Sequence, residues 1–220
     1  MKKFFVALAM VATLLTSTVA LAAFEETIIE DAELAAVHKL AIALPDFYKV
    51  TDREPSLTEL TKLLADAGKA QSALEIVTYE EVASNIRRDT GINIYSLDIP
   101  EADKIFKENV AKYADSYLVL TVANNSDKAW LFYYIYDAAD SKLMYAYQVQ
   151  GHLIGRSTKD YTNATRDFYK QFDSAAAKSL NKEERKKFKE QQKESRENKR
   201  EATLQIERKS KQKEDLVRKK

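Results

Sequence analysis

The sequence predicts an α+β fold: a single domain in which helices pack on a mixed sheet containing a three-strand antiparallel meander, followed by a long charged C-terminal helix. The first observation behind this prediction is the stretch Ala114–Val149, which holds three strand-like runs rich in β-branched and aromatic residues. The second is a set of amphipathic segments with capping signals before and after that stretch. These segments supply the helices that must cover at least one face of the meander.

The N-terminus has the features of a secretory signal peptide. Lys2 and Lys3 precede the apolar run Phe4–Leu15, and a small-x-small pattern ends at Ala22. The apolar run of about 12 residues is shorter than the roughly 20 residues that a membrane-spanning helix needs. We therefore expect removal of residues 1–22 by cleavage near Ala22, which leaves a periplasmic or secreted bacterial protein with no integral membrane segment.

The chain contains no cysteine. This absence excludes disulfides, thiol catalysis, cysteine-ligated zinc and a lipid-modified N-terminal cysteine. A small eukaryotic secreted module would more often be rich in cysteine, so the composition favours a bacterial envelope protein.

Charge divides the mature chain into an acidic body and a basic tail. Residues 181–220 hold 16 Lys/Arg and 9 Asp/Glu, a net charge of +7, whereas residues 1–180 carry a net charge of −6. We expect an N-terminal arm or short helix over residues 23–38, one α+β domain over residues 39–180, and a charged helical or disordered tail over residues 181–220. The body is long enough to bury one sizeable core.

The predicted elements before the meander are two strands and three helices. The strands are Lys39–Leu44 and Ala73–Val77. Each helix opens with a capping motif, in which a side chain accepts a hydrogen bond from a free backbone N–H. Gly68 and Gly91 are expected to end the first two helices. The predicted helices span residues 56–68, 78–91 and 98–113, and a further short strand is expected at residues 92–95.

The meander is expected to consist of strands at residues 116–123, 129–137 and 142–149. Pairing Ala123 with Ala129, and Asp137 with Lys142, sets a register across its two loops. Because side chains alternate along a strand, this register places the aromatic row of the middle strand on the same face as the alternating leucines of the first strand. We interpret this row as ordinary core because aromatic residues dominate core burial. The row consists of Trp130, Phe132, Tyr134 and Tyr136.

The opposite face of the meander is mixed in character, and it is the candidate contact surface. Its predicted binding residues are Tyr117, Leu131, Tyr133 and Met144. If they contact a partner, serine at Leu131 and Tyr133 weakens binding without unfolding the protein.

The sequence contains no catalytic constellation. Its two histidines, His38 and His152, lie in no recognisable nucleophile setting and have no metal-ligand spacing around them. Capping explains the acidic pair Asp98 and Glu101. With four glycines in the whole chain, there is no glycine-rich phosphate loop. We expect no enzymatic activity, no cofactor and no metal.

After the meander, Ser157 or Thr158 is expected to cap a long helix that ends at Leu180. The tail beyond it has a helical composition without glycine or proline, so we expect a solvated helix that continues from the body and frays. Its charge would attract polyanions, and export leaves anionic envelope polymers or lipid head groups as partners instead of nucleic acid. We favour a tail that only solubilises the protein, and a tail that folds back on the acidic body is the third possibility.

Four segments share their order and character with known proteins: Lys39–Pro45 (KLAIALP), Leu74–Ile86 (LEIVTYEEVASNI), Tyr113–Val122 (YADSYLVLTV) and Tyr134–Tyr147 (YIYDAADSKLMYAY). They resemble a group of bacterial envelope domains that includes the amino-terminal domain of TolB, the lipoprotein activators of penicillin-binding proteins and the curli secretion channel. The chain departs from this group in lacking a lipid-anchor cysteine and in having Leu120 and Thr121 where the group tends to have a glycine. The resemblance implies a non-enzymatic module that binds other envelope components, and it transfers no functional residue.

The sequence as a whole therefore predicts an exported, non-enzymatic protein that binds a protein or polymer partner in the periplasm or cell wall. One alternative is a hydrolase that uses two close carboxylates with perturbed titration. The other is a holding chaperone that grips exported chains with its charged tail.

Overall fold

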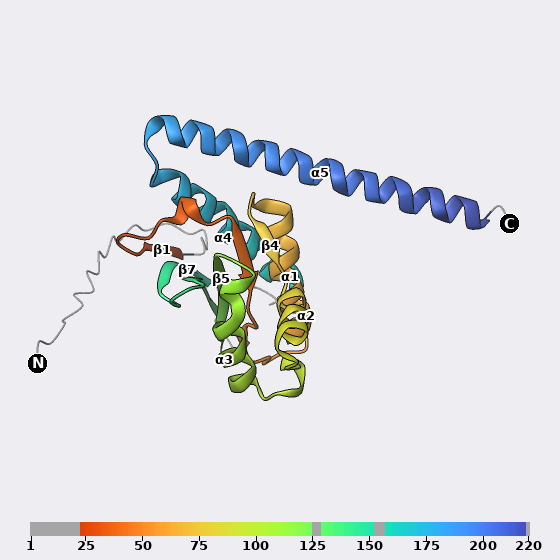
Figure 1. Cartoon of the computed structure of the whole chain (residues 1–220), viewed down its shortest axis with the longest axis horizontal. Coiled ribbons are helices and arrows are strands. Elements are labelled where there is room, and N and C mark those ends of the chain that lie inside the picture. Colours follow the sequence, from red (N-terminus) through yellow and green to blue (C-terminus); the bar gives the residue numbers. More distant parts are fainter. Residues whose placement is uncertain (1–22, 125–128, 152–156, 219–220) are drawn as a thin grey trace, which may run out of the picture.

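The computed structural model describes residues 23–124, 129–151 and 157–218 (Figure 1). The predicted signal peptide, residues 1–22, and His152 lie outside the described residues. A seven-stranded mixed sheet packed by helices confirms the predicted α+β class. The strands are β1 (Ala23–Ile28), β2 (Lys39–Ile42), β3 (Asp46–Phe47), β4 (Glu75–Val77), β5 (Ser116–Asn124), β6 (Ala129–Asp137) and β7 (Leu143–Gly151). The helices are α1 (Leu57–Gln71), α2 (Tyr79–Thr90), α3 (Ile99–Asn109), α4 (Thr158–Lys178) and α5 (Lys182–Arg218), with short 3-10 turns η1 (Leu34–Ala36), η2 (Ile94–Ser96) and η3 (Val110–Lys112).

The strands follow the order β1-β7-β6-β5-β2-β4 across the sheet, and β3 pairs with β5 beside this path. Antiparallel pairing joins β1, β7, β6 and β5, which confirms the predicted meander. Strand β2 is parallel to both of its neighbours, β4 and β5. This mixture follows from the connections, because parallel neighbours need helical crossovers whereas a meander needs only short loops.

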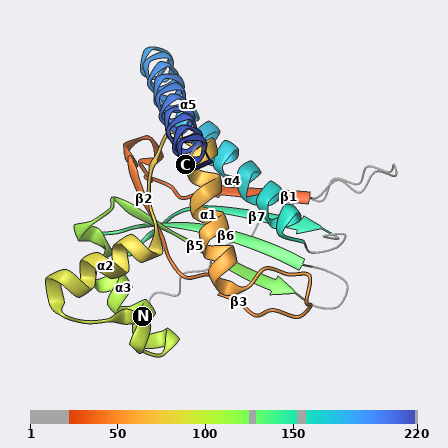
Figure 2. The same ribbon diagram turned by 90° about the vertical axis from the view of Figure 1, so that its right-hand side faces the viewer.

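Two apolar clusters lie on opposite faces of the sheet. The larger joins α1 and α4 to one face of β2, β5, β6 and β7, with Phe168 of α4 fully buried against it. The smaller joins α2 and α3 to the other face, over β2, β4 and the adjoining ends of β5 and β6. Figure 2 shows α1 and α4 lying across the front of the sheet, with α2 and α3 gathered at one end of it. The two faces are therefore covered to different extents.

The predicted capping motifs open the three helices. Ser56, Thr78 and Asp98 each accept a hydrogen bond from the backbone N–H three residues further on, at 3.2, 3.2 and 2.9 Å. Helix α2 ends at Gly91, which has a positive φ of 77° and so adopts the left-handed conformation that glycine tolerates best. These features are local in the chain, and the sequence predicts them correctly.

The predicted end of the first helix at Gly68 is wrong, because α1 continues to Gln71. Gly68 lies inside the helix and faces α4, where a Cβ atom would come within 2.6 Å of both Cζ and Oη of Tyr169. The glycine therefore permits a close approach of two helices and does not terminate one.

Two further segments differ from their predicted elements in part or in full. Residues 23–38, expected to be an arm or short helix, do contain a short 3-10 helix, η1, but they begin with strand β1, which pairs along the edge of the sheet with β7. The short strand expected at residues 92–95 is instead part of a loop that contains η2. A single sequence does not show that an acidic N-terminal segment has a sheet edge available to it.

The predicted register of the middle strand is wrong by one residue. Asn124 pairs with Ala129, so β6 is shifted against β5. At the next loop the predicted pairing of Asp137 with Lys142 is present, because the N–H of Asp137 donates to the carbonyl of Lys142. A bulge after Ile135 then shifts the rest of β6 by one residue against β7. A one-residue shift exchanges the two faces of a strand. Because both faces of β6 are apolar, hydrophobic alternation did not reveal the error.

Candidate functional site

The face of β6 that points away from α1 and α4 carries a row of aromatic side chains. Trp130, Phe132 and Tyr134 are partly exposed and belong to neither apolar cluster. Thr121 of β5 and Gln148 of β7 pair with Phe132 from either side, so they share this face. We name this surface the open aromatic face. Its residues are Thr121, Trp130, Phe132, Tyr134, Ala146 and Gln148.

One end of the aromatic row contacts the part of the sheet that α2 and α3 cover. The rings of Phe132 and Tyr134 lie 6.2 Å apart with their planes inclined by 6°, and Tyr136 follows 6.2 Å beyond Tyr134. Tyr136 in turn stacks at 5.2 Å on Tyr117, which is buried beside Phe106 of α3. This chain of ring contacts orders the partly exposed Phe132 and Tyr134 before any partner binds, which lowers the entropic cost of association.

The six residues of the open aromatic face include no charged side chain, but two carboxylates flank it: Asp46 of β3 pairs with Thr121, and Glu25 of β1 pairs with Gln148. The centres of protein interfaces are enriched in Tyr, Trp and Phe and depleted in charged residues. Aromatic side chains are also prominent among the residues whose truncation costs most binding energy. The composition of this face therefore matches the centre of an interface.

The four predicted binding residues do not form an exposed surface. Leu131 and Tyr133 are 0% exposed and Tyr117 is 1% exposed. Tyr133 lies beneath α4, where its ring stacks 4.5 Å from that of Phe168 and its hydroxyl lies 3.1 Å from the hydroxyl of Thr165. Tyr117 faces α3 on the opposite side of the sheet, and Met144 packs against the α1–α4 cluster. The prediction fails for β6 because its register is shifted by one residue. The shift buries Leu131 and Tyr133, and it leaves the aromatic row that was expected to be core partly exposed.

A signal for the correct face was present in the strands that flank β6. In β5 the core side carries Leu118 and Leu120, while the other side carries Thr121; in β7 the second face carries Gln148. These polar positions identify the wetter side of the sheet, on which the aromatic row lies. The sequence does not show which residues of β6 stand beside them.

Helix α5 does not continue α4 as predicted. A turn at Asn181 reverses the chain, and Asn181 caps α5 by accepting from the backbone N–H groups of Glu183 and Glu184, both at 3.0 Å. Arg185 reaches back to the carbonyl of Ala177 at 2.8 Å. Figure 1 shows α5 crossing the body and then extending past it. The structure thus agrees with the alternative in which the tail folds back on the acidic body.

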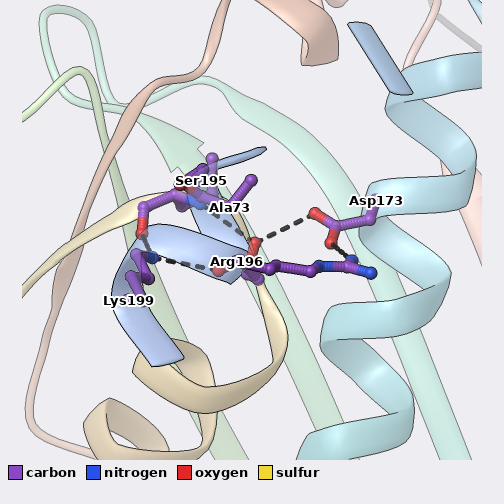
Figure 3. A network of polar contacts seen from close by, with 7 residues as sticks. Ala73, Asp173, Ser195, Arg196 and Lys199 are labelled. Atoms are coloured by element: carbon purple, nitrogen blue, oxygen red, sulfur yellow. Dashed lines mark hydrogen bonds and ion pairs between the residues drawn. The ribbon is translucent and has the colours of Figure 1, made fainter. Parts of the chain in front are cut away.

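A polar network fastens the first half of α5 to the body (Figure 3). Asp173 of α4, only 6% exposed, accepts from Arg196 Nη2 at 2.6 Å and from Ser72 Oγ at 2.9 Å. Lys199 Nζ donates to the carbonyl of Leu74 at 2.6 Å, and Ser195 donates to a neighbouring carbonyl at 3.1 Å. The contacts fall on one side of α5, over the segment that precedes β4.

Burial perturbs the titration of this network. It raises the pKa of Asp173 above the ordinary value of 3.8, although the hydrogen bonds from Arg196 and Ser72 oppose the shift. Burial also lowers the pKa of Lys199 below 10.5. Because desolvation offsets much of the Coulomb attraction, the network contributes more to the position of α5 than to net stability.

The described residues give little support to a catalytic site. They contain no group of three or more potential metal ligands. His38 is exposed. Acidic side chains gather in a hollow of about 480 Å³ that includes Asp137 and Asp140, but hydrogen bonds from Lys142 lower the pKa of Asp140, whereas a general acid needs a raised value. Asp173 has a raised pKa, but no second carboxylate lines its hollow.

Among the described helices, none combines the length and the hydropathy required to cross a membrane.

No protein-family model matches the chain, and no curated protein sequence matches it. Among solved structures, the PelC dodecamer from Paraburkholderia phytofirmans is 11% identical, with a TM-score of 0.36 over 67% of this chain and 94% of that chain. The LpoB C-terminal domain from Salmonella enterica is 15% identical, with a TM-score of 0.38 over 52% and 82%. Lipoprotein GNA1162 from Neisseria meningitidis is 13% identical, with a TM-score of 0.32 over 52% and 79%.

All three likenesses are weak, and they do not extend the resemblance inferred from the sequence beyond the α+β fold. Identities and TM-scores this low carry no argument about function.

Proposed function

We propose that this chain is an exported, non-enzymatic protein of the bacterial envelope that docks a protein partner on the open aromatic face. The observation that supports this most is the row formed by Trp130, Phe132 and Tyr134, which is partly exposed and lies outside both apolar clusters. Aromatic side chains are enriched at the centres of protein interfaces, and they are prominent among the residues that contribute most of the binding energy. The signal peptide that the sequence predicts at residues 1–22 supports the location.

The partner contacts the aromatic row as the centre of the interface, and the polar side chains of Thr121 and Gln148 contribute hydrogen bonds at its sides. A protein partner is favoured over a polymer because the centre of the face is uncharged and rich in aromatic residues, as interface centres are, while the charged Asp46 and Glu25 lie at its sides. The anchored stack from Tyr117 through Tyr136 keeps the rings in place. Binding on this face requires no movement of α2 or α3, which cover the neighbouring part of the sheet.

The test places a photo-crosslinking amino acid at position 121 of the full chain, in place of Thr121, and crosslinking is carried out in intact cell envelopes. A discrete adduct with one protein is expected, and the double variant Phe132→Ser with Tyr134→Ser should abolish it. The matched control is Tyr95→Ser with Ile99→Ser, which removes two exposed apolar side chains of the α2–α3 connection, 59% and 65% exposed. The control should leave the adduct intact.

An adduct that survives the Phe132 and Tyr134 changes would refute the proposal. Circular dichroism of the variant must match that of the parent chain, since unfolding would remove any adduct. A polymer partner would instead give no protein adduct, together with cosedimentation on isolated cell wall that the same two changes abolish. Trp130 is the only tryptophan, so its fluorescence should change when a purified partner is added.

A further inference from the structure

Helices α4 and α5 enclose an open hollow of about 310 Å³ with an unusual concentration of positive charge. This volume lies at the lower end of the range typical of small-molecule sites, about 300–1,000 Å³. A single acidic residue, Asp173, lines it. The cationic residues that line it are Lys170, Lys178, Arg185, Lys189 and Arg196.

The positive charges of the hollow are incompletely compensated. Arg196 pairs with Asp173 at 2.6 Å and so accounts for the one negative charge in the lining. Arg185 donates to three backbone carbonyls at 2.8–3.1 Å, which satisfy its hydrogen bonds but carry no net charge. Lys178 lies 4.0 Å from Glu26, and the exposed Lys170 lies 3.1 Å from Asp167, which are weak surface pairs.

Lys189 is the cation best placed to receive a ligand. Within the described part of the chain, it forms neither a hydrogen bond nor an ion pair, although it lines the hollow. The hydroxyl of Ser174 and the amide of Gln192 line the same hollow and supply further donors. The free ammonium of Lys189, the neutral donors and the surrounding cations of α4 and α5 are a suitable environment for an anion.

We propose that the hollow between α4 and α5 binds a phosphate group with two negative charges, either as free phosphate or as the terminal phosphate of a larger molecule. The charge excess of the lining favours a dianion over a single carboxylate, because each nearby cation adds to the attraction. Bound phosphate bridges α4 and α5 and reinforces the reversal of the chain at Asn181. This site lies apart from the open aromatic face, so the inference goes beyond the proposed function and does not depend on it.

The experiment is a titration of the isotopically labelled full chain with inorganic phosphate, followed by amide chemical shifts, with sodium chloride adjusted to constant ionic strength. Saturable shifts are expected at Ser174, Lys189 and Gln192. Lys189→Glu should weaken the apparent affinity at least tenfold, a difference of about 1.4 kcal/mol. The matched control Lys186→Glu makes the same charge change on α5 at an exposed residue outside the lining, and should weaken it less than twofold.

A second arm distinguishes the sources of the phosphate group. Vesicles of phosphatidylcholine with phosphatidic acid are sedimented with the parent chain and with both variants. Sedimentation that Lys189→Glu abolishes and Lys186→Glu preserves supports a lipid phosphate. Saturable shifts with inorganic phosphate but no sedimentation support a small phosphate ligand. Shifts that do not saturate, or equal losses in both variants in both arms, overturn the site, because they indicate only general attraction to a basic helix.

Discussion

Replacing Gly68 with alanine tests whether α1 and α4 pack as closely as the structure shows. Gly68 lies inside α1, and a Cβ atom there would approach Tyr169 Cζ and Oη to 2.6 Å and Ile76 Cδ1 to 2.9 Å. Tyr169 is fully buried, and its hydroxyl donates to the carbonyl of Leu64 at 3.0 Å. The ring therefore has no solvent-exposed space into which it can move without losing this hydrogen bond.

The expected magnitude follows from three opposing contributions. Alanine gains about 1 kcal/mol over glycine inside a helix. Overpacking a filled core typically costs about 1–3 kcal/mol, and leaving the buried Tyr169 hydroxyl or its acceptor unsatisfied costs about 1–3 kcal/mol more. We expect Gly68→Ala to lower the free energy of unfolding by about 3 kcal/mol, with the helix gain already subtracted.

The assay is urea unfolding followed by far-ultraviolet circular dichroism, with the midpoint shifted and the denaturant dependence unchanged. The matched control is Ala70→Gly, an exposed position of the same helix that measures the helix-propensity contribution alone, at about 1 kcal/mol. A Gly68→Ala protein that is more stable than the parent by a similar amount would refute the close approach of Tyr169.

Two further predictions concern α5 and the first capping box. The double variant Arg196→Gln with Lys199→Gln should raise the rate of amide hydrogen exchange in the first half of α5 at least tenfold, while the sheet stays protected. The control Lys193→Gln removes an exposed ion pair and should leave the exchange rate of α5 unchanged. Unchanged exchange in the double variant would mean that other contacts hold the helix. Ser56→Ala should cost about 1 kcal/mol of stability at neutral pH, measured by urea unfolding. Hydrogen bonds from Ser56 lower the pKa of Glu59 below 4.5, so the contribution of this carboxylate is present above pH 4.5 and is lost as the pH falls through the lowered value. The backbone N–H of residue 56 still donates to Glu59 in Ser56→Ala, so the variant loses only the bond from the hydroxyl. The difference between parent and Ser56→Ala should therefore shrink in part on acidification, and a constant difference would show that the bond between the Ser56 hydroxyl and Glu59 does not contribute.

The sequence alone determined the features that depend on neighbours along the chain. Capping by Ser56, Thr78 and Asp98 involves groups three residues apart, so the motifs identify helix starts without knowledge of the fold. The left-handed end of α2 at Gly91 follows from the conformational freedom of glycine. The meander follows from the composition of its strands, and together these features were sufficient to predict the α+β class.

The tertiary structure alone decided which face of β6 is buried and where α5 lies. Both faces of β6 are apolar, so the choice depends on a bulge after Ile135 and on the packing of α4, neither of which leaves a local pattern. That choice buries Tyr133 and leaves Phe132 on the open aromatic face. The position of α5 similarly depends on contact between Asp173 and Arg196, two residues whose charges suggest no pairing until a turn brings the helices together. Local propensities select elements, whereas burial and charge pairing between distant segments select surfaces, and the candidate sites of this protein are surfaces.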